Sequence, residues 1–303
     1  MNNKKKLLLI DSNSLIHRAF HALPPLTNRK GDQLGAVYGF LLVFFKGLKD
    51  INPQYVAAAF DVKGPTFRHK EFDLYKAQRP KMSFDLSQQI PKVKRVLRSF
   101  RVPIFEKQGF EADDIIGTIS QIMSSEENIE TIIMSGDKDL FQLIDSKTKV
   151  YGLRKGVKDT VLYNIEEVIL KYEGLKPKQL IDFKGLRGDP SDNITGVPGV
   201  GEKTGIKLIK TFGSLEKLYE ELEEKEKIEG VSKRIREKLL NNKKEAFLSK
   251  KLVKIKCDVP INFTLKDCLF DDYKIEEIKG IFNEFEFNSL VEKIPRINIS
   301  ENY

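Results

Sequence analysis

The sequence has few of the residues that bind soft metals or act as catalytic nucleophiles. Among its 303 residues, only three are histidine and two are cysteine. Cys257 and Cys268 have no CxxC spacing and no histidine nearby, which argues against a zinc site. We expect both to be reduced residues of a small C-terminal core, as is usual in a reducing compartment. No residues follow the spacing of a serine or cysteine protease.

Long apolar runs are also missing. The longest uncharged apolar run near the N-terminus is Leu7–Ile10, and Asp11 ends it. That run is too short for a membrane span or for the core of a signal peptide. We therefore expect a cytoplasmic protein with no membrane partner.

The chain lacks an excess of negative charge. It carries 52 Lys and Arg against 44 Asp and Glu, a net charge of +8, and 40% of its residues are hydrophobic. This composition is ordinary for a soluble globular protein, and the length allows one large domain or two smaller ones. The positive balance favours nucleic acid as a partner, because neutralised phosphates release condensed counterions.

Short apolar runs in the first half of the chain predict the strands of a sheet. Each run is bounded by polar or turn residues, which favours strands over free-standing helices. The runs are Leu7–Ile10, Tyr55–Phe60, Val102–Phe105, Thr131–Met134 and Val161–Tyr163. Helical patterns separate most of them; the clearest is the stripe Leu86, Ile90, Val93, Leu97 and Phe100 behind a candidate N-cap at Ser83. The alternation predicts an α/β fold with a mostly parallel central sheet flanked by helices.

The amino-acid composition changes near residue 175. Glycine-rich turns appear there, followed by stretches rich in lysine and glutamate. We therefore expect an α/β domain over residues 1–174 and a mostly helical domain over residues 175–303.

Carboxylates follow four of the predicted strands. Because the carboxyl ends of parallel strands meet at one edge of a sheet, we expect these side chains to converge on one cleft. Two more, Asp189 and Asp192, could reach the cleft from the helical domain. The full set is Asp11, Asp61, Glu111, Asp113, Asp114, Asp137, Asp139, Asp189 and Asp192.

So many like charges need cations, because burying unpaired charge is costly. Oxygen ligands without histidine or cysteine suit Mg²⁺ or Mn²⁺. The number of carboxylates predicts two ions, which in phosphoryl transfer lie about 3.5–4 Å apart. One would lower the pKa of a bound water and the other would stabilise the leaving oxygen. The alternative is that each Asp is only a helix N-cap or turn residue.

Two further segments point to nucleic acid. A glycine turn from Gly196 through Gly199 and Gly201 opens a short helix with Lys203 and Thr204 in its first turn, which is a natural phosphate site. The alternative is a plain packing corner between helices. The connector, residues 63–81, has six basic residues interleaved with Phe67, Phe72 and Tyr75. Such a mixture suits single-stranded nucleic acid, the alternative being a solvated loop.

These motifs together resemble the 5′-nuclease domain of bacterial DNA polymerase I, within the wider flap endonuclease family. The likeness runs over nearly the whole chain. It includes Leu9-Ile10-Asp11, His17-Arg18-Ala19-Phe20-His21, Phe67-Arg68-His69, Tyr75-Lys76-Ala77-Gln78-Arg79, Glu111-Ala112-Asp113-Asp114, Gly136-Asp137-Lys138-Asp139, Gly188-Asp189-Pro190-Ser191-Asp192-Asn193 and Gly199-Val200-Gly201-Glu202-Lys203-Thr204. The resemblance implies a PIN-like, flap endonuclease-like fold.

The resemblance also implies roles for the residues. Asp11, Asp61, Glu111 and Asp113 look like ligands of a first metal, and Asp114, Asp137, Asp139, Asp189 and Asp192 look like a second group. Lys76 and Arg79 resemble the basic residues of a helical arch, about residues 63–100, that guides a single-stranded 5′ end. Arg18 resembles a further basic residue of the active site. Segment 185–213 looks like the helix–three-turn–helix unit that grips duplex DNA, often with K⁺. Arg68, Tyr75, Gly196, Gly199, Gly201, Lys203 and Thr204 are expected to contact DNA.

The expected activity is 5′-3′ exonuclease or flap endonuclease cleavage in replication and repair, by a monomer. The expected substrates are DNA with a 5′ flap, nick or overhang and RNA–DNA primer junctions, with a DNA polymerase in cis or in trans as a further partner. A free-standing nuclease and the front part of a polymerase stay open as alternatives. Two rival functions are a DNA-binding module without catalysis and a phosphatase that uses an aspartate nucleophile.

Overall fold

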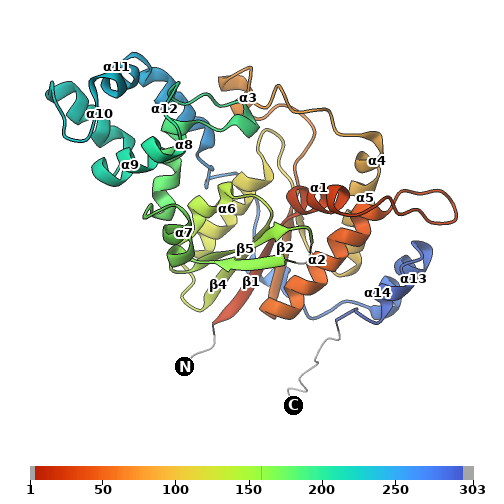
Figure 1. The fold of residues 1–303 in the computed structure, drawn as a ribbon. Coiled ribbons are helices and arrows are strands. Elements are labelled where there is room, and N and C mark those ends of the chain that lie inside the picture. Colours follow the sequence, from red (N-terminus) through yellow and green to blue (C-terminus); the bar gives the residue numbers. More distant parts are fainter. Residues whose placement is uncertain (1–3, 158, 296–303) are drawn as a thin grey trace.

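The computed structural model describes residues 4–157 and 159–295, and its centre is a six-stranded sheet (Figure 1). The strand order is β3-β2-β1-β4-β5-β6. Strands β1 to β5 are parallel to their neighbours, whereas β6 pairs antiparallel with β5. The strands are β1 Lys5–Asp11, β2 Tyr55–Ala59, β3 Ile104–Phe105, β4 Ile129–Ser135, β5 Thr148–Lys155 and β6 Asp159–Tyr163. The expected α/β fold with a mostly parallel sheet is confirmed.

The central strand β1 explains why the sheet can be covered on both faces. Leu7, Leu8, Leu9 and Ile10 are all at most 1% exposed, as expected for a continuous apolar run in a parallel sheet. Leu8 and Ile10 belong to one apolar core and Leu7 and Leu9 to the other. Successive side chains of a strand therefore point to opposite layers.

Helices cover both faces of this sheet (Figure 1). On one face lie α1 (Ser12–Ala22), α2 (Gly35–Ile51) and α5 (Gln89–Ser99). On the other lie α6 (Ala112–Met123), α7 (Ile165–Lys171) and the 3-10 helix η1 (Asp139–Leu143). Between β2 and α5 the chain forms only two short helices, α3 (Phe67–Glu71) and α4 (Phe84–Ser87).

The helical region lies at one end of the sheet, at the upper left of Figure 1. Its elements are η2 (Pro177–Gln179), α8 (Leu180–Arg187), η3 (Pro190–Asp192), α9 (Glu202–Phe212), α10 (Leu215–Glu224), α11 (Lys233–Asn241) and α12 (Lys243–Val253). The helix expected after the glycine turn is α9, and Gly213, with a φ of 84°, is its C-cap. No described helix is long and apolar enough to cross a bilayer.

The C-terminal helices do not stay with this helical region, contrary to the expected domain of residues 175–303. After η4 (Leu265–Cys268), helices α13 (Ile275–Glu284) and α14 (Asn288–Val291) lie beneath α2 and α5 (Figure 1). Phe282 is fully buried there, with its ring centroid 6.2 Å from that of Phe45. The reason is local apolarity: the α2–α5 layer presents aromatic rings, and this segment packs apolar side chains against them.

The structure differs from the expectations at two further places. Strand β5 was not predicted, because Thr148–Lys155 contains no unbroken apolar run. The expected arch over residues 63–100 is not one helical unit: α5 packs in the core through Val93, Val96 and Leu97. The predicted stripe and its cap are confirmed, since the Ser83 side chain accepts a hydrogen bond from the N–H of Leu86.

Candidate metal centre and nucleic-acid interface

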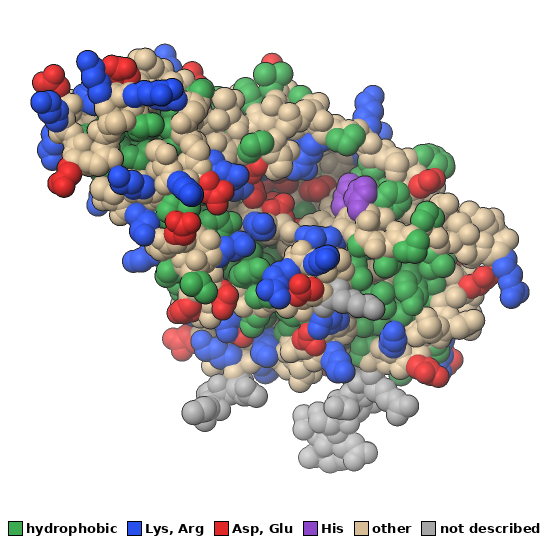
Figure 2. Space-filling model, in the orientation of Figure 1, with side chains coloured by type: hydrophobic (Ala, Val, Ile, Leu, Met, Phe, Trp, Pro, Cys, Tyr) green, Lys and Arg blue, Asp and Glu red, His purple; other side chains and the backbone are tan. Residues whose placement is uncertain are grey.

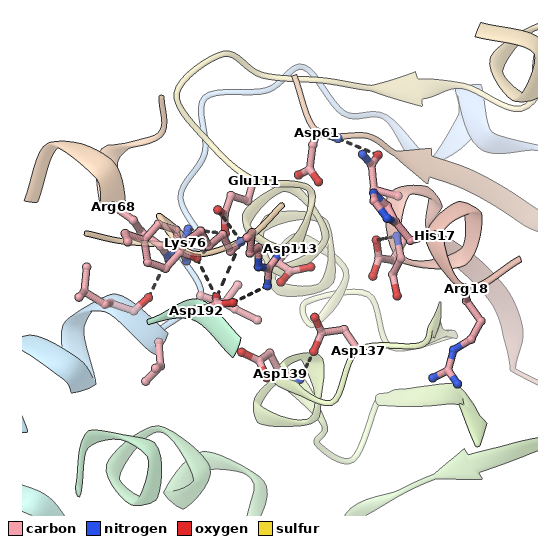
Figure 3. A pocket seen from close by; sticks show the side chains of 18 of the residues that line it. His17, Arg18, Asp61, Arg68, Lys76, Glu111, Asp113, Asp137, Asp139 and Asp192 are labelled. Atoms are coloured by element: carbon pink, nitrogen blue, oxygen red, sulfur yellow. Dashed lines mark hydrogen bonds and ion pairs between the residues drawn. The ribbon is translucent and has the colours of Figure 1, made fainter. Parts of the chain in front are cut away.

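Seven carboxylates from distant segments line one cavity of about 470 Å³ at the carboxyl edge of the sheet. They are Asp11, Asp61, Glu111, Asp113, Asp137, Asp139 and Asp192, and we call this cavity the acidic pocket. Figure 2 shows acidic side chains within a hollow bordered by basic ones, with a histidine at its rim. Figure 3 shows the labelled carboxylates pointing inward: Asp61 after β2, Glu111 and Asp113 at the start of α6, Asp137 and Asp139 after β4, and Asp192 of η3.

Strand ends and helix starts place the first carboxylates. Asp11 ends β1 and caps α1, accepting a hydrogen bond from the N–H of Ser14 at 3.2 Å and another from the Ser135 hydroxyl. Asp61 follows β2 and accepts from the N–H of Ala112 at 2.7 Å. The N-cap alternative is therefore partly correct, but these side chains also face the acidic pocket. Capping fixes their direction, which is what a preorganised ligand needs.

The loop after β4 carries the next two carboxylates. The Ser135 hydroxyl accepts from the N–H of Asp137 at 2.8 Å, and Asp137 accepts from the N–H of Asp139 at 2.8 Å. Gly136 lies close to α1: a Cβ on it would lie 3.1 Å from the Ser14 hydroxyl and 3.3 Å from the Arg18 guanidinium, so these side chains would have to shift slightly. The loop thus presses against α1, which directs both carboxylates into the pocket.

Mutual repulsion and burial disturb the protonation of this group. Burial, followed by the nearby charges of Asp137 and Asp61, raises the pKa of Asp11 to about 7. Burial and Asp137 likewise raise the pKa of Asp139 to about 7, against the effect of Lys184. Burial and the charges of Asp11 and Asp137 raise the pKa of Asp113 well above its usual value. The pocket therefore holds more negative charge than the protein neutralises by itself.

Basic side chains supply part of the missing positive charge. The Lys76 ammonium donates to Glu111 at 2.8 Å and lies 3.8 Å from Asp192, which also pairs with Arg79. The Lys184 ammonium pairs with Asp139 and lies 2.6 Å from Asp189. Within residues 4–157 and 159–295, no three acidic or histidine side chains are grouped closely enough to ligate an ion as they stand. The carboxylates repel one another, and the single positive charges of the neighbouring lysines and arginine offset only part of that repulsion, so the carboxylates stay apart.

Two of the nine expected ligands lie outside the acidic pocket. Asp114 is fully buried, and both its oxygens accept from the Arg68 guanidinium at 2.8 Å. Its place among the second group of ligands is a correction: it neutralises an internal arginine. Asp189 does not line the pocket either. It caps η3 and pairs with Lys184, which lowers its pKa despite burial.

Arg68 and Tyr75 line the acidic pocket but are buried there, and the expectation that they contact DNA stays a prediction. Arg68 is 3% exposed and donates to the carbonyls of Leu252 at 2.8 Å and Lys254 at 3.1 Å. Tyr75 is 2% exposed, and its hydroxyl donates to Glu111 at 3.1 Å and Asp192 at 3.0 Å. Both side chains hold acidic residues in place, so they act within the protein.

The connector is not helical where its two expected catalytic residues lie. Lys76 has a φ of 55°, and Arg79 closes a turn by donating its N–H to the carbonyl of Lys76 at 3.0 Å. The arch that the resemblance implies is therefore not helical at Lys76 and Arg79. Both still point into the acidic pocket, because the N–H of Lys76 is held by the carbonyl of Asp192 at 2.9 Å.

Arg18 lies at the opposite wall of the pocket from Lys76 (Figure 3). Its guanidinium donates to the carbonyls of Leu153 at 3.3 Å and Arg154 at 3.4 Å. It also lines a neighbouring cavity of about 280 Å³. Asn13, Ser14, His17 and His21 line the acidic pocket beside it and were not predicted; their helical spacing after Asp11 is the signal that could have found them.

The three glycines of the glycine turn differ in how much space a Cβ would have. A Cβ on Gly196 would lie 2.3 Å from the backbone N of Gly188, and a Cβ on Gly199 2.0 Å from the Lys238 ammonium. A Cβ on Gly201 would meet nothing within 4 Å. Lys203 is exposed and Thr204 is half-buried in the first turn of α9, where the first N–H groups have no intrahelical acceptor. The turn can therefore offer N–H groups to an anion.

Comparisons with known proteins agree with this arrangement. Residues 6–173 match the profile of the "5′-3′ exonuclease, N-terminal resolvase-like domain" and residues 175–276 that of the "5′-3′ exonuclease, C-terminal SAM fold". DNA polymerase I of Bacillus subtilis (strain 168) is 45% identical over 294 residues, covering 97% of this chain and 33% of that protein. DNA polymerase I of Bacillus caldotenax is 42% identical over 291 residues, covering 96% and 32%. The chain spans about a third of these relatives' length.

Solved structures of nucleases share the fold. T5 5′-exonuclease with zinc ions bound aligns with a TM-score of 0.66 and 19% identity, covering 96% of this chain and all of that one. The catalytic core of Rad2 in complex with DNA substrate aligns with a TM-score of 0.59 and 18% identity, covering 96% and 94%. At such identities the likeness concerns the fold alone.

Proposed function

Since the chain belongs to the 5′-3′ exonuclease family, we propose that it is a metal-dependent nuclease that cuts DNA near junctions of single and double strands. The observation that carries the proposal is the convergence of seven carboxylates on the acidic pocket. The substrates are 5′ flaps, nicks and overhangs, with RNA primers included, in replication and repair. A DNA polymerase in cis or in trans would use the product.

The donor set fits hard divalent cations. It offers only oxygen atoms, and the raised pKa values of Asp11, Asp113 and Asp139 reflect burial first and neighbouring negative charge second. Both causes weaken when a cation binds. Asp11, Asp61, Glu111 and Asp113 would hold one Mg²⁺ or Mn²⁺, and Asp137, Asp139, Asp189 and Asp192 a second. When bound, the ions supply an activated water and stabilise charge on the leaving oxygen.

The chain's own basic groups have a separate task. Lys76 and Arg79 pair with Glu111 and Asp192 at the mouth of the pocket. With those carboxylates engaged as ligands, the ammonium and guanidinium would be free to hold the oxygens of the scissile phosphate. Positive charge held where negative charge develops favours the transition state over the ground state. Arg18 would hold a second phosphate from the opposite wall.

The glycine turn would hold the duplex part of the substrate, with K⁺ as a further ligand of segment 185–213. Its open N–H groups lie at the positive end of α9, a helix of 11 residues. Such a contact reads the backbone and not the bases. Binding should therefore be similar for all duplex sequences.

Two rival functions make different demands. A DNA-binding module without catalysis would gain affinity by losing the carboxylates, which repel phosphate. A phosphatase with an aspartate nucleophile would need neither the connector nor the glycine turn.

A 5′-flap oligonucleotide tests all three functions. We expect the protein to cut the labelled flap strand near the junction with Mg²⁺ and to leave it intact with a chelator. A matched duplex without a flap and a small phosphomonoester serve as comparison substrates. Binding without cleavage in Mg²⁺ and in Mn²⁺ would favour the binding module, and release of phosphate from the monoester alone would favour the phosphatase.

A further inference from the structure

Lys184 is a positive charge that neither the carboxylate motifs nor the connector accounts for. It lies in the last turn of α8, and its side chain is 14% exposed. Its ammonium pairs with Asp139 of η1 and with Asp189 of η3, the latter at 2.6 Å. One lysine therefore bridges a carboxylate of the acidic pocket, Asp139, and one that lies outside it, Asp189.

The local fold fixes this bridge. Gly188 ends α8 with a φ of 76°, and its N–H donates to the carbonyl of Lys184 at 2.8 Å. This turn brings Asp189 back beside Lys184. A Cβ on Gly188 would lie 2.4 Å from the carbonyl of Ile194, so only glycine fits the turn. The ammonium is thus placed by the backbone and not by chance rotation of a surface side chain.

The bridge occupies oxygens that the proposed second ion needs. Asp139 also feels the charge of Asp137, which lies in the same loop. An ammonium brings one positive charge to these carboxylates, whereas a divalent ion brings two and binds more of their oxygen atoms. Lysine has a flexible four-carbon stem, so it can leave when an ion arrives.

We propose that Lys184 is the resident counter-cation of Asp139 and Asp189, and that a divalent ion gains these carboxylates only by displacing its ammonium. The inference rests on the proposed metal-dependent function. It makes Lys184 the residue that sets the affinity of the second ion. The first group of carboxylates, whose neighbour is Lys76, keeps its own affinity.

The test counts Mn²⁺ ions bound to the full chain without DNA, by the electron paramagnetic resonance signal of free Mn²⁺. We expect Lys184→Met to bind its weaker ion about tenfold or more tightly than the original protein, because two charge-assisted hydrogen bonds no longer oppose the ion. Lys184→Arg, which keeps the positive charge, should leave the weaker ion weak.

Lys250→Met is the matched control. The Lys250 ammonium also bridges two carboxylates, Asp182 and Glu216, and its side chain is 22% exposed, but neither of those carboxylates lines the acidic pocket, whereas Asp139 does. This variant should bind Mn²⁺ as the original protein does. The rise in melting temperature on adding Mn²⁺ gives a second measurement, and it should be larger for Lys184→Met than for Lys250→Met.

Each outcome decides the inference. Equal Mn²⁺ affinity and an equal rise in melting temperature for Lys184→Met and the original protein would overturn it while leaving the nuclease proposal intact. Tighter binding in Lys250→Met as well would also overturn it, since any lost lysine would then have the same effect. Absence of bound Mn²⁺ in every protein would overturn both proposals.

Discussion

The guanidinium of Arg68 joins three segments that are far apart in the sequence. It pairs with Asp114 at the start of α6, contacts Glu111 at 3.3 Å, and donates to the carbonyls of Leu252 and Lys254 beyond α12. Arg68 is only 3% exposed, so these contacts are buried. Such a pair costs much when one partner is removed, because the other charge stays buried and unpaired.

We therefore predict that Arg68→Met lowers the free energy of unfolding by about 3–5 kcal/mol. The double variant Arg68→Met with Asp114→Leu should recover part of that loss, because it leaves no unpaired charge. Thermal or denaturant unfolding measures both. At a temperature where the variant is folded, the salt dependence of its DNA binding should match that of the original protein. A flatter salt dependence would show that Arg68 contacts phosphate after all.

At the same scale, the strand-end carboxylates should matter for turnover and not for folding. Asp61→Asn and Asp137→Asn keep an oxygen for the N–H groups of Ala112 and Asp139, which these side chains hold. We expect flap cleavage to fall by about a hundredfold or more, while flap binding stays equal or tightens. Asp271→Asn, at an exposed position, is the matched control. A near-normal cleavage rate in either pocket variant would remove that carboxylate from the metal site.

Among elements, the connector has a test of its own, because Lys76 and Arg79 line the pocket from a part of it that is not helical. Lys76→Ala removes the ammonium that pairs with Glu111. The single-turnover rate should fall more than the affinity for flap DNA, since the charge acts mainly on the transition state. The log–log salt dependence of binding should also flatten by about 0.7–0.9.

Lys81→Ala is the control for the connector, since Lys81 is exposed and belongs to the same segment. It should leave the cleavage rate unchanged. If Lys76→Ala weakens binding but cleaves at the normal rate, Lys76 only tethers the strand. If neither measurement changes, the connector is an ordinary solvated loop.

The glycine turn allows a clean separation of binding from folding. A side chain at Gly201 would meet nothing within 4 Å, and its φ of −85° suits any residue. Gly201→Val should therefore keep the melting temperature but weaken duplex binding about equally for all sequences, because bulk blocks the approach of the phosphate backbone. Gly280→Val, at an open position on α13, is the control. If Gly201→Val leaves the duplex affinity unchanged, the turn is only a packing corner between helices and does not bind DNA.

The elements also show what a sequence can reveal. Strands β1, β2 and β4 were predicted because each is an apolar run buried on both faces. Strand β5 escaped because Gly152 and the polar residues at both ends leave it no unbroken apolar run. The convergence of carboxylates followed from parallel topology alone. The bridge at Lys184 could not be foreseen, because it depends on how α8 lies against η1, and no local pattern encodes that distance.

For the whole molecule, the acidic pocket should make stability depend on pH in an unusual direction. The pKa values of Asp11 and Asp139 are about 7 in the folded protein and 3.8 as ordinary reference values. The folded state thus binds more protons between these values, so the free energy of unfolding falls as pH rises through that window. Divalent ions offset this loss, most strongly where the carboxylates are ionised.

We predict that the melting temperature of the chelator-treated protein falls from about pH 5 to about pH 8. The gain in melting temperature from Mg²⁺ should grow over the same interval, with NaCl of equal ionic strength as the control. Asp139→Asn should flatten the decline, because one carboxylate no longer ionises. A metal-free protein that becomes more stable towards pH 8 would contradict the raised pKa values.

The Arg68 contacts also bear on the order in which the chain acquires its site during synthesis. Leu252, Val253 and Ile255 line the acidic pocket, and the bonds from Arg68 to Leu252 and Lys254 span 184 and 186 residues. Contacts of such long range form late, after the cost of closing the loop has been met. A nascent chain that has emerged only as far as residue 174 contains all six strands of the described sheet, but it lacks Leu252, Val253 and Ile255, which line the pocket. The site is thus completed only when residues 252–255 have joined the first half of the chain.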